Sequence, residues 1–301
     1  MWFKNLRVYH FTKDIDLTPD TLEIALHQQD FTPCTNMDFS RYGWVSPLGN
    51  SGEQYTHKCG DYTMICARKQ EKILPPAAIN EMVEEKVIEF EAVQARSIYR
   101  NEKRTIKEDV VHTLLPRALT RSYLVYAYFD PKNKLLIIDS ASSNKAEEFM
   151  DHLRATLGSL PIAPLKCHGD AANMMTQWLQ GAAPENFELD NECELQNPRE
   201  SKNIVRCKNQ ELESAEIMSH LKAGKRVIQL ALVWREAIRF VLSDDLSIKR
   251  LRFEDIIQEQ AEDDSNDRAT QFDQDFAVMT LQIHEFIKEL LKEFGGMEKP
   301  D

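Results

Sequence analysis

The feature that most constrains this chain is a long stretch without helix breakers. Between Pro76 and Pro116 there is no glycine or proline, and Glu, Lys, Ala, Val and Ile dominate. This composition predicts one helix from about residue 77 to about residue 107, followed by a shorter helix from Val110 to Leu115. A helix of ~30 residues would be ~45 Å long, which is too long for a compact domain of this size to cover. We therefore expect a helical arm that projects from the body.

Strand patterns and capped helices flank the arm on both sides. Together they predict an α+β fold with mixed or antiparallel sheets. Thr18 is the expected N-cap of a helix with Pro19 at its first position, and Gly158 is expected to end another. Expected strands are 2–11, 43–45, 62–67, 122–129, 134–139, 160–165, 227–234, 237–242 and 247–253, and further helices are expected at 144–157, near 218 and at 273–294.

These elements group into four parts. Residues 1–74 with 122–172 are expected to form a central α+β domain, and residues 75–121 the arm. Residues 173–253 are expected to form a second α+β domain, the base. Residues 254–301 are expected to be an acidic connector and a C-terminal helix that packs back on the central domain.

Charge is distributed unevenly along the chain. The formal charge of −12 comes mainly from residues 253–301, where 14 acidic and 4 basic residues leave −10. Two stretches are basic: residues 94–121 hold seven cations against three anions, and residues 218–252 hold eight against three. No apolar run approaches the ~20 residues of a membrane span, and the N-terminus lacks the apolar stretch of a signal peptide, so a cytoplasmic protein is expected.

The first basic stretch has a helical geometry. At 100° per residue, five cations share one face about 100° wide over ~16 Å of a continuous helix. Such a stripe suits a run of DNA phosphates. It also fits a simpler interpretation, because cations near a helix C-terminus complement the helix dipole. The five are Arg96, Arg100, Lys103, Arg104 and Lys107.

Other chemistry receives little support from the residues. The six cysteines have no Cys-x-x-Cys spacing, so they are expected to be core residues, and no metal or cofactor is expected. Phosphate-loop and hydrolase motifs are absent, which argues against an enzyme. A two-metal site would need several converging carboxylates, but the residues of the acidic cluster are mostly consecutive and resemble a solvated connector. The cluster comprises Glu254, Asp255, Glu259, Glu262, Asp263, Asp264 and Asp267.

Long strings along the whole chain resemble the bacterial recombination-associated RdgC family. These strings are unlike general-purpose motifs. They include Trp2 to Leu6, Phe31 to Cys34, Gly43 to Val45, Ile65 to Lys69, Glu71 to Pro75, Leu114 to Ala118, Leu157 to Pro161 and Leu246 to Phe253.

The resemblance implies a nucleoid protein that binds double-stranded DNA, and possibly single-stranded DNA, with little sequence preference. It implies horseshoe-shaped subunits that pair at both ends into a ring-shaped homodimer, with DNA in a basic central hole and RecA filament formation restrained. Pro116 and Leu119 are then expected at one subunit contact. Beyond the stripe, the candidate DNA-binding residues are Lys72, Arg117, Arg121, Lys208 and Gln210, together with Lys222, Lys225 and Arg226 of the second basic stretch.

Two function classes stay open at this point. In the first, the ring coats duplex DNA and so blocks the recombinase. In the second, the acidic C-terminal region mimics nucleic acid and binds the recombinase directly. Only the second expects the two proteins to bind each other without DNA.

Overall fold

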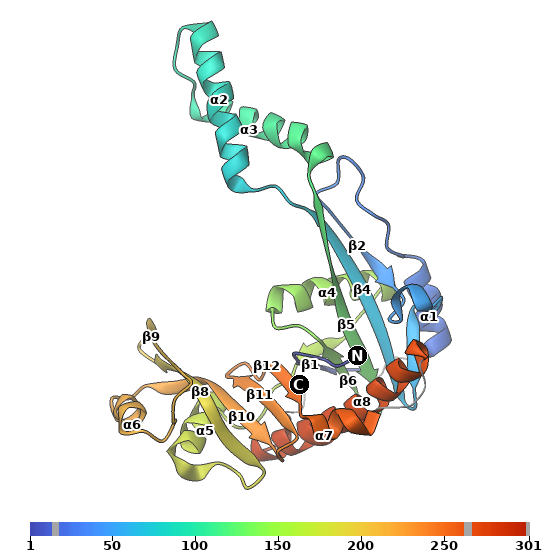
Figure 1. Cartoon of the computed structure of the whole chain (residues 1–301), viewed down its shortest axis with the longest axis vertical. Helices are drawn as coiled ribbons and strands as arrows, with labels where there is room; N and C mark the ends of the chain where they lie inside the picture. The colour runs from blue at the N-terminus through green and yellow to red at the C-terminus, as the bar shows by residue number, and fades with distance from the viewer. Residues whose placement is uncertain (14–17, 262–266, 299–301) are drawn as a thin grey trace.

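Two antiparallel sheets and the helices around them form the body of the molecule (Figure 1). The structure is a computed structural model and describes residues 1–13, 18–261 and 267–298. The first sheet has the strand order β2-β4-β5-β6-β1-β7, with β3 also paired to β4, and the second has the order β12-β11-β10-β8-β9. The chain is thus α+β, as expected, and its named strands pair antiparallel.

The elements follow one another along the chain in this order. They are β1 (Arg7–Phe11), α1 (Pro19–His27), β2 (Ser40–Val45), β3 (Thr56–Cys59), β4 (Tyr62–Lys72), α2 (Pro76–Gln94), α3 (Arg100–Leu114), η2 (Leu115–Arg117), β5 (Thr120–Asp130), β6 (Leu135–Ile138), α4 (Ser143–Leu157), β7 (Ile162–Pro164), α5 (Ala171–Gln177), β8 (Phe187–Asn197), β9 (Glu200–Lys208), α6 (Ala215–Lys222), β10 (Arg226–Trp234), β11 (Ile238–Ser243), β12 (Ile248–Phe253), α7 (Asp255–Gln258) and α8 (Arg268–Glu293). Within these helices, none combines the length and apolar character needed to cross a bilayer.

Helix α8 joins the two sheets through one continuous apolar core. Its Phe276 lies 5.9 Å from Tyr128 of the first sheet, between ring centroids. Its Phe286 lies 5.5 Å from Trp234 and 4.7 Å from Phe240, both in the second sheet. The sequence produces this helix because apolar residues recur at three- and four-residue spacing along it. The division into central, arm, base and C-terminal domains stays a proposal.

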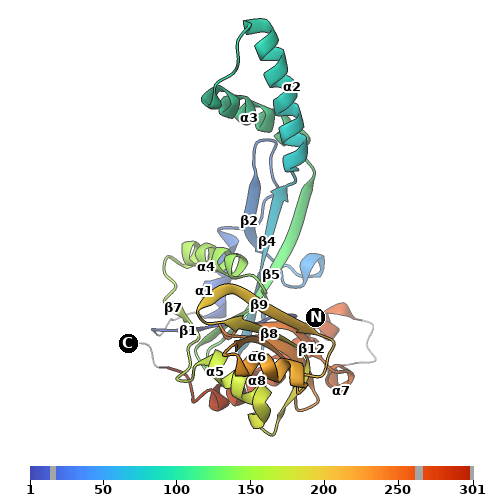
Figure 2. The ribbon, with the colours of Figure 1, turned by 90° about the vertical axis from the view of Figure 1, so that its left-hand side faces the viewer.

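The predicted single arm helix is wrong. Helix α2 ends at Gln94, where Ala95 adopts a left-handed conformation with φ 50°, and α3 begins at Arg100. The turn lets Ile79 and Val83 of α2 pack on Ile106 and Val110 of α3. A continuous helix would have left both apolar stripes in water, so their mutual burial favours the break. The arm nevertheless projects far from the sheets, at the end of β4 and β5 (Figures 1 and 2).

Most of the remaining predicted elements are present. Thr18 caps α1 by accepting a hydrogen bond from the Thr21 amide at 3.2 Å, and Gly158 ends α4 with φ 75°. The strand predicted from Trp2 begins only at Arg7. The residues before it instead pair with the second sheet: the Leu6 amide donates to the Ile248 carbonyl at 2.8 Å.

Because His152 is partly buried, we expect the folding stability of the protein to depend on pH. The imidazole of His152 lies 5.0 Å from the Trp44 ring and 4.8 Å from Tyr42, and this burial lowers its pKa below 6.5. The unfolded chain therefore binds a proton more readily than the folded chain, and the free energy of unfolding should fall as pH drops from 7 to 5. His152→Gln should make that slope shallower, by less than about 1.4 kcal/mol per pH unit. Urea melts at pH 7, 6 and 5 measure it, and an equal slope in both proteins contradicts it.

Candidate nucleic-acid interface

Four of the predicted cations lie on one side of helix α3. Arg100, Lys103, Arg104 and Lys107 are exposed and fall within an arc of about 100° over about 10 Å of the axis. Arg104 has a loose ion pair with Glu108, at 3.8 Å. The other three form no ion pair with any residue that the structure describes. These four residues are called the α3 cations below.

Arg96 does not belong with them, so the five-residue stripe is wrong. It precedes α3, in the turn after α2. Its guanidinium binds both carboxylate oxygens of Glu102, at 2.6 and 2.9 Å, and lies 5.5 Å from the Tyr99 ring centroid. The hydrogen bonds from Arg96, and a further one from the Tyr99 amide, lower the pKa of Glu102 to about 2. Arg96 therefore braces the turn of the arm instead of presenting a free charge.

The break in the arm also changes the dipole argument. In one continuous helix the cations would have stood near the C-terminus, where positive charge is favourable. Arg100 and Lys103 instead stand at the N-terminal end of α3, and Arg104 follows one residue later. Unsatisfied amides make that end partly positive, so cations there are unfavourable for the helix by a few tenths of a kcal/mol each. The stability of the helix therefore does not account for the α3 cations.

A second group of predicted residues lies where the arm joins the first sheet. Leu119 is 77% exposed, although its carbonyl accepts a hydrogen bond from the Ile73 amide at 2.8 Å. Pro116 and Arg117 are exposed in the short turn η2, and Lys72 is half-buried at the end of β4. Arg121 is bound to Glu71 at 2.5 Å. This region thus combines an exposed apolar side chain with neighbouring positive charge.

The third group lies at the far end of the second sheet, on β9, α6 and the start of β10. Lys222 is exposed and unpaired among the described residues, whereas Lys225 binds Asn203 and Arg226 lies 3.7 Å from Asp170. Gln210 contacts Ser214 at 3.5 Å.

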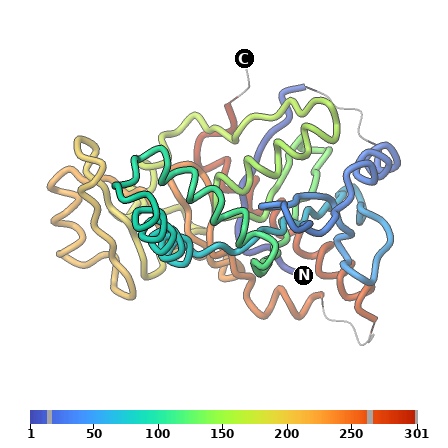
Figure 3. Tube along the Cα trace, turned by 90° about the horizontal axis from the view of Figure 1, so that it is seen from above, coloured from blue at the N-terminus to red at the C-terminus, as the bar shows by residue number. Residues whose placement is uncertain are grey.

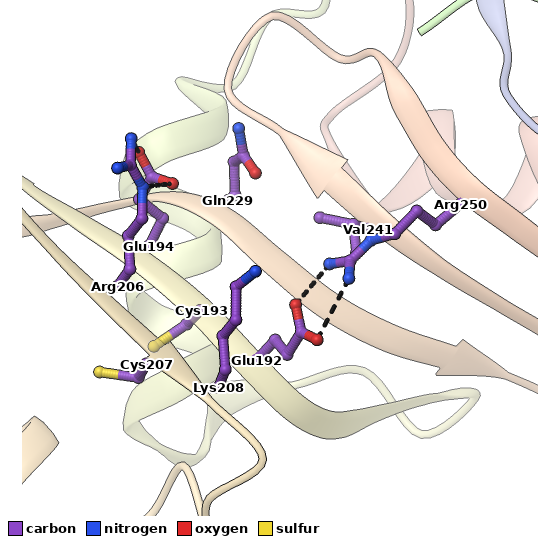
Figure 4. A pocket seen from close by; sticks show the side chains of 9 residues that line it. All are labelled: Glu192, Cys193, Glu194, Arg206, Cys207, Lys208, Gln229, Val241 and Arg250. Atoms are coloured by element: carbon purple, nitrogen blue, oxygen red, sulfur yellow. Dashed lines mark hydrogen bonds and ion pairs between the residues drawn. The ribbon is translucent and has the colours of Figure 1, made fainter.

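Lys208 lines a hollow on the face of the second sheet that carries Glu192 and Glu194 (Figure 4). Arg250 holds Glu192 with two hydrogen bonds, at 2.5 and 3.1 Å, and Arg206 holds Glu194 at 2.9 Å. Arg206 and Arg250 are therefore largely neutralised inside the chain. Sequence reasoning missed Arg206 because β9 was not predicted, although Val205 and Cys207 alternate with Arg206 and Lys208 as in a half-buried strand.

The predicted cations do not form one patch within a single chain. The arm and the second sheet lie at opposite ends of the molecule, with the long strands β4 and β5 between them. In Figure 1 the arm and the second sheet both extend to the left of strands β4 and β5. In the view from above, the arm lies over the half of the molecule that carries the second sheet (Figure 3). The α3 cations and Lys222 are thus separated along the length of the molecule but lean to a common side.

Metal chemistry has little support in the described part of the chain. There, no group of three or more His, Cys, Asp or Glu residues is placed to hold a metal ion. Of the acidic cluster, Glu262, Asp263 and Asp264 lie outside the described residues.

Comparisons with known proteins cover nearly the whole chain. The family model described as "RdgC: Putative exonuclease, RdgC" matches residues 1–297. A recombination-associated protein RdgC of Aeromonas hydrophila is 43% identical, over 99% of both chains. One from Psychromonas ingrahamii is 44% identical, over 98% of this chain and 99% of its own. The chain therefore belongs to the RdgC family of recombination-associated proteins.

Proposed function

We propose that this protein binds double-stranded DNA with little sequence preference, acting as a ring-shaped homodimer on the nucleoid that limits RecA filament formation. The observation that carries the proposal is the placement of the α3 cations. All four are exposed and mostly unpaired among the described residues, and Arg100, Lys103 and Arg104 lie near the N-terminal end of α3, where positive charge is unfavourable. An anionic partner gives them a role, and DNA is the anionic polymer expected of a protein associated with recombination.

Sequence preference is expected to be weak because the candidate contacts are cations. They suit phosphates, which carry no sequence information directly, and no base-reading module stands out among the described elements. The span of about 10 Å covered by the α3 cations corresponds to about three phosphates along one strand, at ~3.4 Å of axis each. A second subunit and the cations of the second sheet would raise the number of phosphates contacted. The acidic residues concentrated after residue 253 then account for the net charge without entering the interface.

Strong salt dependence is the direct test of this proposal. If about six phosphates are neutralised, raising salt from ~50 to ~200 mM should weaken binding roughly 10³-fold, because neutralisation releases condensed counterions. Titration of duplexes of unrelated sequence at four salt concentrations measures this. A marked preference for one duplex contradicts the proposal, as does release of nucleotides from linear DNA in Mg²⁺. Binding to RecA without DNA would instead support the acidic-mimic alternative.

Dimer formation is expected to use the exposed Leu119. A closed ring of two subunits needs two different isologous contacts, and the exposed apolar side chain at the arm junction suits one of them. Sedimentation at micromolar concentration should give twice the chain mass of 34.9 kDa. Leu119→Asp should weaken the dimer, whereas Leu281→Asp on α8, where Leu281 is 59% exposed, should not. A wild-type protein that sediments as a monomer rules out the ring.

A further inference from the structure

The two cysteines of the β8–β9 hairpin face each other directly. Cys193 of β8 and Cys207 of β9 are register partners in the antiparallel pair. Partners in such a pair have Cα atoms about 4.5 or 5.5 Å apart, and both values lie within the range of about 4.4–6.8 Å that disulfides require. The other four cysteines face no cysteine across any strand pair that the structure describes.

The side chains of this pair also point the same way. Both thiols are buried, at 4% and 8% exposure, on the core side of the second sheet. Figure 4 shows their sulfur atoms close together and directed away from Glu192 and Lys208. No backbone rearrangement is therefore needed to bring the sulfurs into reach of each other.

We propose that Cys193 and Cys207 form an oxidisable dithiol, which a peroxide converts into a disulfide across β8 and β9. One thiolate attacks a peroxide oxygen, which gives a sulfenic acid and, with the thiol proton, one water. The second thiol displaces the sulfenic hydroxyl, which closes the S–S bond and releases a second water. Two thiols and one hydrogen peroxide thus give one disulfide and two waters, and the two electrons pass from sulfur to peroxide.

The rate of this oxidation depends on how easily the oxidant reaches the two thiols and on how much of each is present as thiolate. Burial raises the pKa of the Cys193 thiol to about 12, so its thiolate is scarce at neutral pH. However, β9 is the edge strand of its sheet, and its first four residues are exposed. Edge strands open locally more readily than central ones, which admits a small oxidant. We therefore expect slow oxidation that selects this pair because each sulfur has a resolving partner beside it.

The link would change the part of the sheet that carries Lys208. In the dithiol state, only backbone hydrogen bonds and core packing hold β9 to β8. In the disulfide state a covalent bond joins the two strands, between the neighbouring register partners Glu192 and Lys208 on one side and Glu194 and Arg206 on the other. The edge strand could then no longer separate from its neighbour at this point. The proposal does not depend on DNA binding.

Peptide mapping of the full-length protein tests the proposal. After treatment with hydrogen peroxide and blocking of free thiols, trypsin cuts at Arg199, Lys202 and Arg206, between the two cysteines. A peptide pair joined through Cys193 and Cys207, and released by reductant, is expected as the main disulfide product. Cys207→Ser should abolish it, and Cys66→Ser should not.

A second measurement does not rely on a variant. The thermal midpoint of the wild-type protein should rise on oxidation and return on reduction, because a cross-link restricts the unfolded chain. The proposal is overturned if Cys193 and Cys207 stay reduced while Cys34 or Cys59 is oxidised. It is also overturned if the disulfides that form join other cysteines.

Discussion

Replacing Arg100 and Lys103 together by glutamate is expected to weaken binding to every DNA duplex by roughly 60-fold at about 0.1 M salt. Each lost phosphate contact removes about 0.9 from the slope of log affinity against log salt, so two contacts remove about 1.8. Over the tenfold range of salt from ~1 M down to ~0.1 M, a slope change of about 1.8 amounts to a factor of roughly 60. Folding stability should stay unchanged or rise slightly, because glutamate is favourable at a helix N-terminus. Binding titrations at several salt concentrations, together with a thermal melt, measure both effects.

A matched control has the same change of charge elsewhere. Lys132 and Lys292 are exposed at the end of the body opposite the arm, one in the β5–β6 turn and one in the last turn of α8. Lys132→Glu with Lys292→Glu should leave the salt slope nearly intact, apart from a small long-range effect. Equal losses in both double variants would mean that net charge, and not the α3 cations, governs binding. An unchanged slope in the arm variant would move the DNA path toward Lys222 and its neighbours.

The second large effect concerns the core that joins the two sheets. Phe286→Ala is expected to lower the free energy of unfolding by about 3–5 kcal/mol, because it leaves a cavity beside Trp234 and Phe240. The side chain has no exposed surface, so solvent cannot compensate for the lost contacts. Urea denaturation followed by tryptophan fluorescence measures the change.

Leu281→Ala on the same helix is the matched control. Its side chain is 59% exposed, so its removal should cost less than about 0.5 kcal/mol. A loss below about 1 kcal/mol for Phe286→Ala would show that α8 packs less tightly on the second sheet than the ring distances indicate.

The sequence was most informative where periodicity and capping agree. Helix α8 combines a regular apolar stripe with Gly295 and Gly296 after its end, and it was placed within about five residues. Strands β10 to β12 were found because apolar residues dominate them. Strands β8 and β9 are harder to recognise because few of their residues are apolar: β9 has only Ile204, Val205 and Cys207, and its first four residues are all polar or charged.

The arm shows what sequence alone could not decide. Nothing local forces a turn at Ala95, since alanine is a strong helix former and rarely adopts a positive φ. The break follows from the burial of Ile79 and Val83 against Ile106 and Val110, which is a contact between segments. The cationic residues of α3 can be identified from the sequence because their helical spacing is local. The pairing of Arg96 with Glu102 cannot, because it exists only once the turn has formed.

The pairing of residues 3–6 with the far end of the chain has a consequence for the order of folding. The Leu6 amide binds Ile248, the Leu251 amide binds the Lys4 carbonyl at 2.7 Å, and the Phe3 amide lies 3.1 Å from the sulfur of Met279. These contacts span more than 240 residues, and non-local contacts form slowly because a long loop must close first. During synthesis, the first residues must wait until nearly the whole chain has left the ribosome. The arm, whose contacts are local, can assemble well before them.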